Sequence, residues 1–134
     1  MMKIWGMTDI GLVRRENQDA YAVRVCEDTG HTVCVVCDGM GGPGGGRIAS
    51  TLAVETFLDA CQGNLRRGMD AGEVRQVADF AVAAANRAVY QRSQADPSLK
   101  GMGTTLVSVV AWEDQAMISN VGDSRAYLIR PAEG

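Results

Sequence analysis

The chain has 134 residues, of which 46% are apolar and 22% charged, and its formal net charge is −3. This apolar fraction is too high, and this charge too small, for a disordered chain, and the mild acidity leaves no basic surface for nucleic acid. The longest unbroken apolar run, residues 80–85, is far shorter than the roughly 20 residues that span a bilayer. An acid already at Asp9 interrupts any secretory leader, so we expect a cytoplasmic protein without a membrane partner.

The N-terminal part of the chain has the composition of β-strands. Weak strands are expected at residues 2–8 and 20–27, and a buried strand at 32–38, where apolar and β-branched residues run together. The turn at 28–31 joins the last two strands as a hairpin, and His31 is expected to be a solvated turn residue.

Two helices are predicted to follow. Apolar residues at helical spacing predict the first from about residue 47 to residue 61. Asp70 and Glu73 have the spacing of a capping box, which opens a second helix that continues to about residue 94. Pro97 marks the end of this helix, because the residue before a proline avoids helical geometry.

The C-terminal third is again rich in β-forming residues. Strands are expected at 104–112, 115–121 and 125–130. An order of strands, two helices and strands differs from the alternating pattern of a doubly wound sheet. It predicts an α+β fold, a layered α/β sandwich of largely antiparallel β-sheet with two packed antiparallel helices.

Two of the four cysteines, Cys34 and Cys37, have the C-x-x-C spacing of redox and zinc sites. They lie inside a predicted strand, however, where positions i and i+3 point to opposite faces. No second pair accompanies them. We therefore interpret them as small hydrophobic residues of a buried strand rather than as ligands or a redox pair.

A glycine-rich loop follows the buried strand, with six of the 16 glycines between Gly39 and Gly46. Gly39-x-Gly41-x-x-Gly44 matches a dinucleotide fingerprint, but its acid, Asp59, falls inside the predicted helix and no βαβ unit surrounds it. The phosphate-loop pattern also fails, because the lysine and hydroxyl residues that must follow its last glycine are missing. Thermal-shift measurements with NAD and ATP would test a nucleotide-binding function directly.

Three aspartates lie at ends of predicted strands. Asp38 ends the buried strand, and the adjacent Gly39 allows a backbone carbonyl to approach an ion closely. Asp19 begins the preceding strand, and Asp123 lies in a Gly-Asp-Ser-Arg turn. Oxygen ligands alone select Mg²⁺ or Mn²⁺, and a nearby Arg14 would hold a phosphate bidentately. The pattern therefore predicts a metal-dependent phosphate site at one edge of a sheet.

Four segments, in this order, resemble motifs of the bacterial metal-dependent Ser/Thr protein phosphatases (PPM, type 2C). They are residues 11–20 (GLVRRENQDA), 35–42 (VVCDGMGG), 103–105 (GTT) and 120–127 (NVGDSRAY). The order and spacing of all four are much more specific than any single motif.

The resemblance implies a role for each candidate residue. Asp38 would bridge two Mn²⁺ or Mg²⁺ ions, the Gly39 carbonyl would complete one ion's shell, and Asp19 would serve the other ion. Asp123 would belong to a third metal site, and Arg14 would bind the substrate phosphate. The substrates implied are proteins phosphorylated by a cognate Ser/Thr kinase, attacked by a metal-activated water.

Catalytic domains of this family are longer than 134 residues, and their second half supplies further metal-binding aspartates. We therefore expect residues 1–134 to be the N-terminal portion of a single phosphatase domain, binding Mn²⁺ poorly and turning over slowly or not at all. The alternative function is a catalytically incomplete fragment that acts as a binding or assembly module. An unpaired strand edge near residues 125–130 would favour its self-association.

Overall fold

The structure, a computed structural model, describes residues 18–122. Its elements in chain order are β1 (Asp19–Cys26), β2 (His31–Met40), α1 (Gly45–Asn64), α2 (Ala71–Ala95), the short 3₁₀ helix η1 (Pro97–Leu99), β3 (Gly103–Thr104), β4 (Leu106–Trp112) and β5 (Gln115–Val121). The strands predicted at 2–8 and 125–130, and with them the edge expected to favour self-association, lie outside the described residues.

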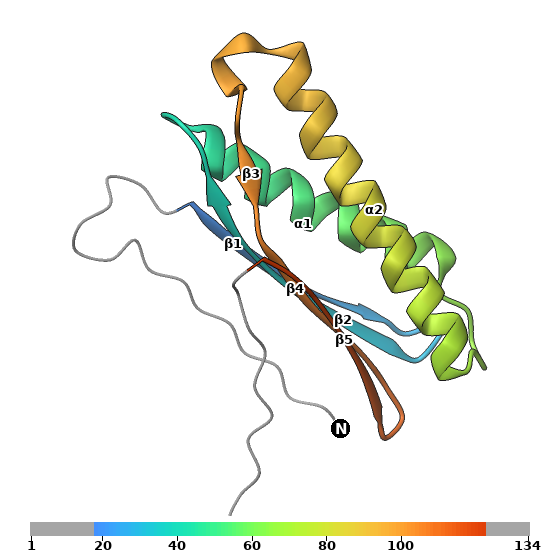
Figure 1. Ribbon diagram of the computed structural model, residues 1–134. Helices are drawn as coiled ribbons and strands as arrows, with labels where there is room; N and C mark the ends of the chain where they lie inside the picture. The colour runs from blue at the N-terminus through green and yellow to red at the C-terminus, as the bar shows by residue number, and fades with distance from the viewer. Residues whose placement is uncertain (1–17, 123–134) are drawn as a thin grey trace, which may run out of the picture.

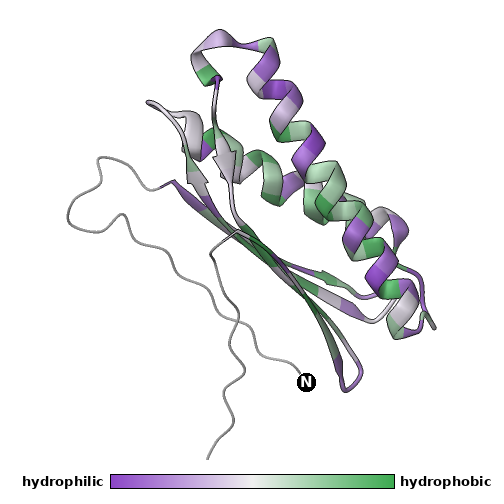
Figure 2. Cartoon of the chain, viewed as in Figure 1, coloured by the Kyte–Doolittle hydropathy of each residue, from purple (hydrophilic) through white to green (hydrophobic). Residues whose placement is uncertain are grey.

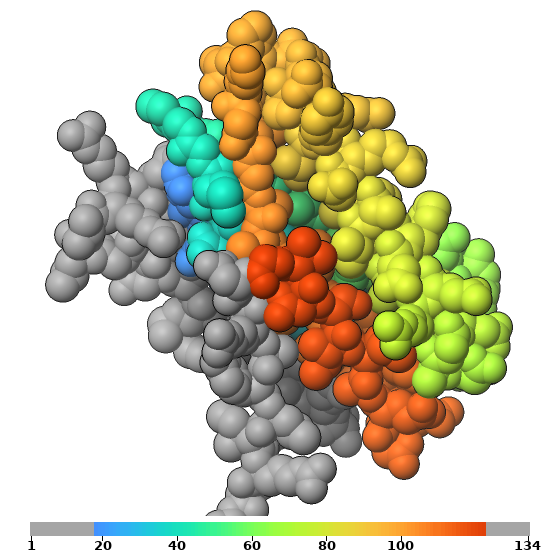
Figure 3. All heavy atoms as spheres, viewed as in Figure 1, coloured from blue at the N-terminus to red at the C-terminus, as the bar shows by residue number. Residues whose placement is uncertain are grey.

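The strands form one antiparallel sheet in the order β1-β2-β4-β5, and β3 extends the sheet by pairing with the end of β2. Both helices cover the same face of this sheet: α1 packs on β1 and β2, and α2 packs on α1 and along β5 (Figure 1). The space-filling view shows α2 and β5 side by side on one side of the molecule (Figure 3). The predicted α+β fold, with antiparallel sheet and two packed helices, is confirmed.

The hydrophobic core lies between the sheet and the helices. In β2, Val33, Val35 and Cys37 are at most 1% exposed and belong to the same cluster as Phe57 of α1. Hydropathy alternates along α2, as expected for a helix with one face against the core (Figure 2). Burying a side chain such as Phe57 contributes about 1.5–3 kcal/mol, so this layer provides much of the driving force for folding.

The opposite face of the sheet carries the alternate residues of β1 and β2. Several large apolar side chains on this face are only partly covered: Tyr21 is 41% exposed, Val25 59% and Val36 49%. Asp38 lies two residues after Val36 in β2. Side chains two apart in a strand project from the same face, so Asp38 belongs to this face rather than to the core. The two layers of the fold therefore separate the hydrophobic core from the candidate metal ligands.

The boundaries of the glycine segment differ from the prediction at both ends. β2 continues through Gly39 and Met40, because these residues pair with Thr104 and Gly103 of β3. At the other end, α1 begins already at Gly45. Only four residues, rather than the predicted eight of 39–46, therefore connect strand and helix.

The helix ends follow the predicted signals in part. The capping box is present: the Asp70 carboxylate accepts a hydrogen bond from the Glu73 amide (2.8 Å), and Glu73 Oε1 accepts one from the Asp70 amide (3.3 Å). Asp96, the residue before Pro97, caps the C-terminus of α2 as expected. The first helix, in contrast, continues beyond residue 61 to Asn64.

The two cysteines of the C-x-x-C spacing lie on opposite faces of β2, as the strand interpretation requires. Cys37 is fully buried, and burial raises the pKa of its thiol to about 12. Cys34 is partly exposed, and burial also raises its thiol pKa. Neither thiol is therefore poised as a thiolate at neutral pH.

The expectation for His31 is wrong. It is only 1% exposed, because it is the first residue of β2 and pairs with Trp112 of β4, whose ring centroid is 5.8 Å away. Its Nδ1 is 2.8 Å from the Thr29 hydroxyl, whereas its buried Nε2 has no hydrogen-bond partner. Burial lowers the pKa of His31 below its ordinary value, so the fold favours the neutral ring.

Acidification should therefore destabilise the protein through His31, its only histidine. Because the folded-state pKa is lower than the unfolded-state pKa, the stabilisation is complete above the unfolded value and is lost as the pH falls below it. We expect the urea midpoint to fall between about pH 7.5 and pH 5.5, on either side of the ordinary pKa of about 6.5. The fall should be smaller in His31→Phe, and an equal fall in both proteins would contradict this account.

Candidate metal centre

Two of the predicted ligands, Asp19 and Asp38, are directly opposite each other in the β1–β2 ladder. Opposed residues of an antiparallel pair project from the same face with their Cβ atoms about 4.5–5.5 Å apart. Both side chains are partly buried, and the Oδ1 atom of Asp19 is shielded from solvent. The hairpin thus brings these two carboxylates together at one end of the sheet.

Thr105 fixes the backbone of Asp38. The Asp38 amide donates to the Thr105 hydroxyl (3.1 Å), and the Thr105 amide donates to the Asp38 carbonyl (2.9 Å). The Thr104 hydroxyl in turn donates to the Thr105 carbonyl (2.8 Å), so the Thr105 hydroxyl, rather than a backbone carbonyl, is the acceptor for the Asp38 amide. Asp38 is therefore held between β1 on one side and the β3–β4 junction on the other.

Glycine is required at positions 39 and 46, because the backbone segments around Gln18, Gly39 and Gly46 approach one another closely. A Cβ atom at Gly39 would overlap the Gly46 carbonyl group and lie 2.9 Å from the Gln18 carbonyl oxygen, to which the Gly39 amide donates a hydrogen bond (3.0 Å). A Cβ atom at Gly46 would lie 2.6 Å from the Gln18 side chain. The start of β1, the end of β2 and the first turn of α1 thus meet without intervening side chains.

This arrangement suits a hard divalent cation. Two carboxylates that project from the same face of one hairpin attract a cation placed between them. Carboxylate oxygens on a fixed backbone are ligands that Mg²⁺ and Mn²⁺ accept. Among residues 18–122, no three His, Cys, Asp or Glu side chains lie close enough together to hold a metal ion. The described part of the chain therefore offers the pair Asp19 and Asp38 as candidate ligands.

The other two predicted site residues, Arg14 and Asp123, lie outside residues 18–122. The residue before Asp123 is described: Gly122 has a φ of 96°, and a Cβ there would lie 2.7 Å from the Thr105 Cγ2 atom. The end of β5 therefore packs on the residue that holds Asp38.

The motif at residues 103–105 did not identify Thr105 as a residue that positions a ligand. The available signal was the hydroxyl itself, since a threonine at a strand junction can replace a backbone acceptor. The acid of the dinucleotide alternative, Asp59, lies in α1 and forms an ion pair with Arg24 (2.9 Å). It thus joins α1 to β1 at the protein surface.

Removing the Thr105 hydroxyl should displace Asp38. Thr105→Val keeps the shape but leaves the Asp38 amide without its acceptor, and an unsatisfied buried donor costs about 1–3 kcal/mol. We expect a lower urea midpoint and weaker Mn²⁺ binding in calorimetry of the full-length protein. Thr105→Ser, which retains the hydroxyl, should restore most of the Mn²⁺ affinity. Equal Mn²⁺ affinity for the Val variant and the parent would contradict the positioning role.

The sequence matches the protein phosphatase 2C family over residues 14–134, and the chain belongs to that family. It is 35% identical over 123 residues to the serine/threonine phosphatase stp of Listeria monocytogenes, covering 92% of this chain and 48% of that protein. It is 36% identical over 140 residues to the protein phosphatase PhpP of Streptococcus pneumoniae, covering 98% of this chain and 52% of PhpP. The chain therefore spans about half the length of these curated relatives.

Solved structures agree with the fold. The crystal structure of Stp1 from Staphylococcus aureus has a TM-score of 0.81 at 31% identity, covering 92% of this chain and 48% of that chain. The catalytic domain of the serine/threonine phosphatase PstP, in complex with two manganese ions, has a TM-score of 0.67 at 30% identity, covering 86% and 45% respectively.

Proposed function

We propose that the protein to which this chain belongs is a metal-dependent phosphatase that hydrolyses phosphoserine and phosphothreonine in proteins. The observation that carries this proposal is the direct opposition of Asp19 and Asp38 at one end of the sheet, in a chain of the protein phosphatase 2C family. Relatives named as serine/threonine phosphatases support the substrate class. The manganese in the PstP complex supports the choice of cofactor.

Asp38 would bridge two Mn²⁺ or Mg²⁺ ions, Asp19 would hold one of them, and the Gly39 carbonyl would complete a coordination shell. Ions bound there supply an activated water and neutralise charge on the phosphoryl group. Asp123 would serve a third ion. The protein's own contribution is rigidity, because the hydrogen bonds of Asp38 with Thr105 hold the ligand in place before substrate arrives.

Arg14 would bind the substrate phosphate and orient it toward the carboxylates. Neither Cys37 nor His31 is placed to act as the nucleophile. The Cys37 thiol faces the core with a pKa raised to about 12, and His31 is buried at the other end of β2. Attack by water rather than by a side chain is consistent with this distribution of groups.

The proposed partners are proteins phosphorylated by a cognate Ser/Thr kinase, and the proposed compartment is the cytoplasm, where such kinases use ATP. No helix among residues 18–122 is long and apolar enough to cross a membrane. The acidic composition gives no reason to propose nucleic acid as a partner.

The test uses the full-length protein with phosphoserine, phosphothreonine and phosphotyrosine peptides of one sequence. We expect release of phosphate from the first two, loss of activity on chelation with EDTA, and recovery on addition of Mn²⁺. Hydrolysis that persists unchanged in EDTA would contradict the proposal. Preference for phosphotyrosine would retain the metal centre but overturn the substrate class.

A further inference from the structure

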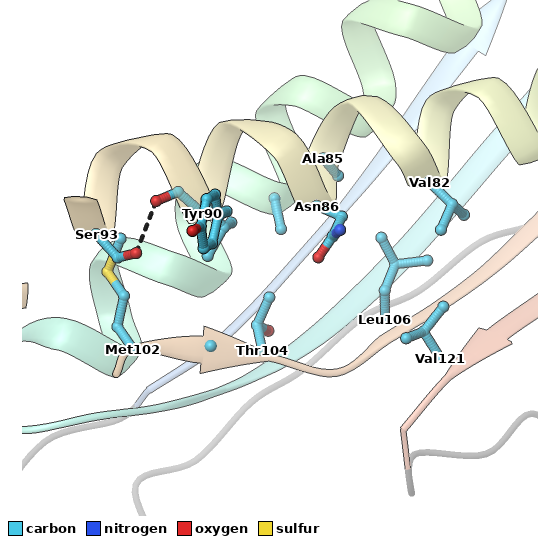
Figure 4. Close-up of a pocket in the computed structure, with 12 residues that line it drawn as sticks. Val82, Ala85, Asn86, Tyr90, Ser93, Met102, Thr104, Leu106 and Val121 are labelled. Atoms are coloured by element: carbon cyan, nitrogen blue, oxygen red, sulfur yellow. Dashed lines mark hydrogen bonds between the residues drawn. The ribbon is translucent and has the colours of Figure 1, made fainter. Parts of the chain in front are cut away.

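A cavity lies on the helix-covered face of the sheet. It has a volume of about 200 Å³, is partly open to solvent, and is lined by α2 and Ala53 of α1 on one side and by β3, β4 and the end of β5 on the other. Figure 4 shows Asn86 extending from α2 toward the strands and Thr104 extending from β3 toward the helix. The carboxylates of the candidate metal centre belong to the opposite face of the sheet, so this cavity is separate from them.

The cavity lining is apolar with a few neutral polar groups. Val82, Ala85 and Leu106 form part of its wall, and none of its described lining side chains is charged. The Ser93 hydroxyl donates to the Tyr90 carbonyl (2.7 Å), which leaves its oxygen able to accept a hydrogen bond. The Asn86 amide can both donate and accept. This chemistry excludes a phosphate or a carboxylate as the ligand, because nothing in the described lining would compensate its charge.

The size of the cavity limits the ligand further. An apolar cavity of about 150 Å³ can accommodate benzene, so a space of this order holds one substituted ring. A hydroxyl or amide on that ring would find partners in Asn86 and Ser93. The fitting ligand is therefore a neutral monocyclic compound with a single hydrogen-bonding group.

The cavity is connected to the metal centre through β3. Thr104, which lines the cavity, pairs with Gly39 on β2. Its hydroxyl also donates to the carbonyl of Thr105, the residue whose amide and hydroxyl hold the backbone of Asp38. A ligand that contacts Thr104 thus touches the strand against which Gly39 and Asp38 are fixed.

We propose that the cavity between α2 and β3 binds a neutral monocyclic compound bearing one hydroxyl or amide group, and that its occupation changes the environment of Asp38 and Gly39 through β3. This inference is independent of the proposed phosphatase activity. It concerns an uncharged ligand on the other face of the sheet and requires no metal.

The test is a titration of the ¹⁵N-labelled full-length protein, without metal, followed by two-dimensional NMR. Benzyl alcohol is the probe, and benzoate, with the same ring and a negative charge, is the control. We expect saturable shifts at Asn86 and Thr104, smaller shifts with the same midpoint at Asp38 and Gly39, and no saturable shift with benzoate.

Two variants locate the site. Val82→Phe, which fills the cavity from a half-buried position, should weaken benzyl alcohol binding at least tenfold. Arg87→Ala, on the same helix but outside the lining, should leave it unchanged. If Val82→Phe fails to fold, Asn86→Ala at an exposed position should weaken binding several-fold.

Three results would overturn the proposal: shifts that rise linearly without saturation, equal binding of benzoate, or shifts confined to the exposed apolar face around Val25. Binding at Asn86 and Thr104 with no shift at Asp38 or Gly39 would overturn the connection through β3. Phosphatase activity plays no part in these readouts, so their failure is distinguishable from failure of the proposed function.

Discussion

Asp38→Asn in the full-length protein should reduce Mn²⁺-dependent hydrolysis of p-nitrophenyl phosphate by at least about 10³-fold, the order of effect seen when a major electrostatic contribution to a transition state is removed. The amide has nearly the same shape as the carboxylate but no charge, so it cannot bridge two cations. The backbone hydrogen bonds with Thr105 do not involve the substituted group, so the fold should be retained.

The matched control for this prediction is Asp28→Asn. Asp28 is an exposed residue of the β1–β2 turn, at the other end of the hairpin, and the same loss of charge there should leave the rate unchanged. Asp19→Asn should lower the rate less than Asp38→Asn, because Asp19 is proposed to serve one ion rather than two. An Asp38→Asn protein that keeps more than a tenth of its activity with the parent's Mn²⁺ dependence would refute the assigned role.

Gly39→Ala should be the most destabilising single substitution near the site. Its Cβ atom would overlap the Gly46 carbonyl, a backbone group that cannot turn aside as a flexible side chain can. Relief requires separating the end of β2 from the start of α1, which also moves Asp38. We expect a loss of about 3–5 kcal/mol in the free energy of unfolding, in the range that marks severe strain or broken packing.

Two other glycines of the same segment serve as controls. Gly42 has open space around its Cα and a φ that other residues adopt, so Gly42→Ala should be neutral or stabilise the protein by about 0.4–1 kcal/mol through the unfolded state. Gly44 also has open space, but its φ of 80° should cost alanine about 1–2 kcal/mol. Urea midpoints should therefore fall in the order Gly42, Gly44, Gly39. A Gly39→Ala midpoint equal to that of Gly42→Ala would show that the close contact with Gly46 is wrong.

The parts of the site that were predictable depend on contacts between neighbours in the sequence. A turn at residues 28–31 brings the start of β1 to the end of β2, so the convergence of Asp19 and Asp38 could be expected from a hairpin and two strand-end acids. The two helices could also be predicted from local signals. Their apolar spacing and the Asp70 capping box identify them without knowledge of the rest of the fold.

What could not be predicted depends on distant segments. The contact of Asp38 with Thr105 joins residues 67 positions apart, and no local pattern indicates that a hydroxyl completes that ladder. The burial of His31 depends in the same way on Trp112, in a strand formed much later in the chain. Turn signals around His31 correctly predicted a hairpin, but the side chain's environment was set by its neighbour across the sheet.

The most direct test of the metal centre is anomalous diffraction at the manganese absorption edge, from crystals of the full-length protein grown with Mn²⁺. We expect a manganese peak between β1 and β2, within coordinating distance of an Asp38 carboxylate oxygen and adjacent to Asp19. Manganese found only elsewhere, with no peak beside Asp38, would contradict it.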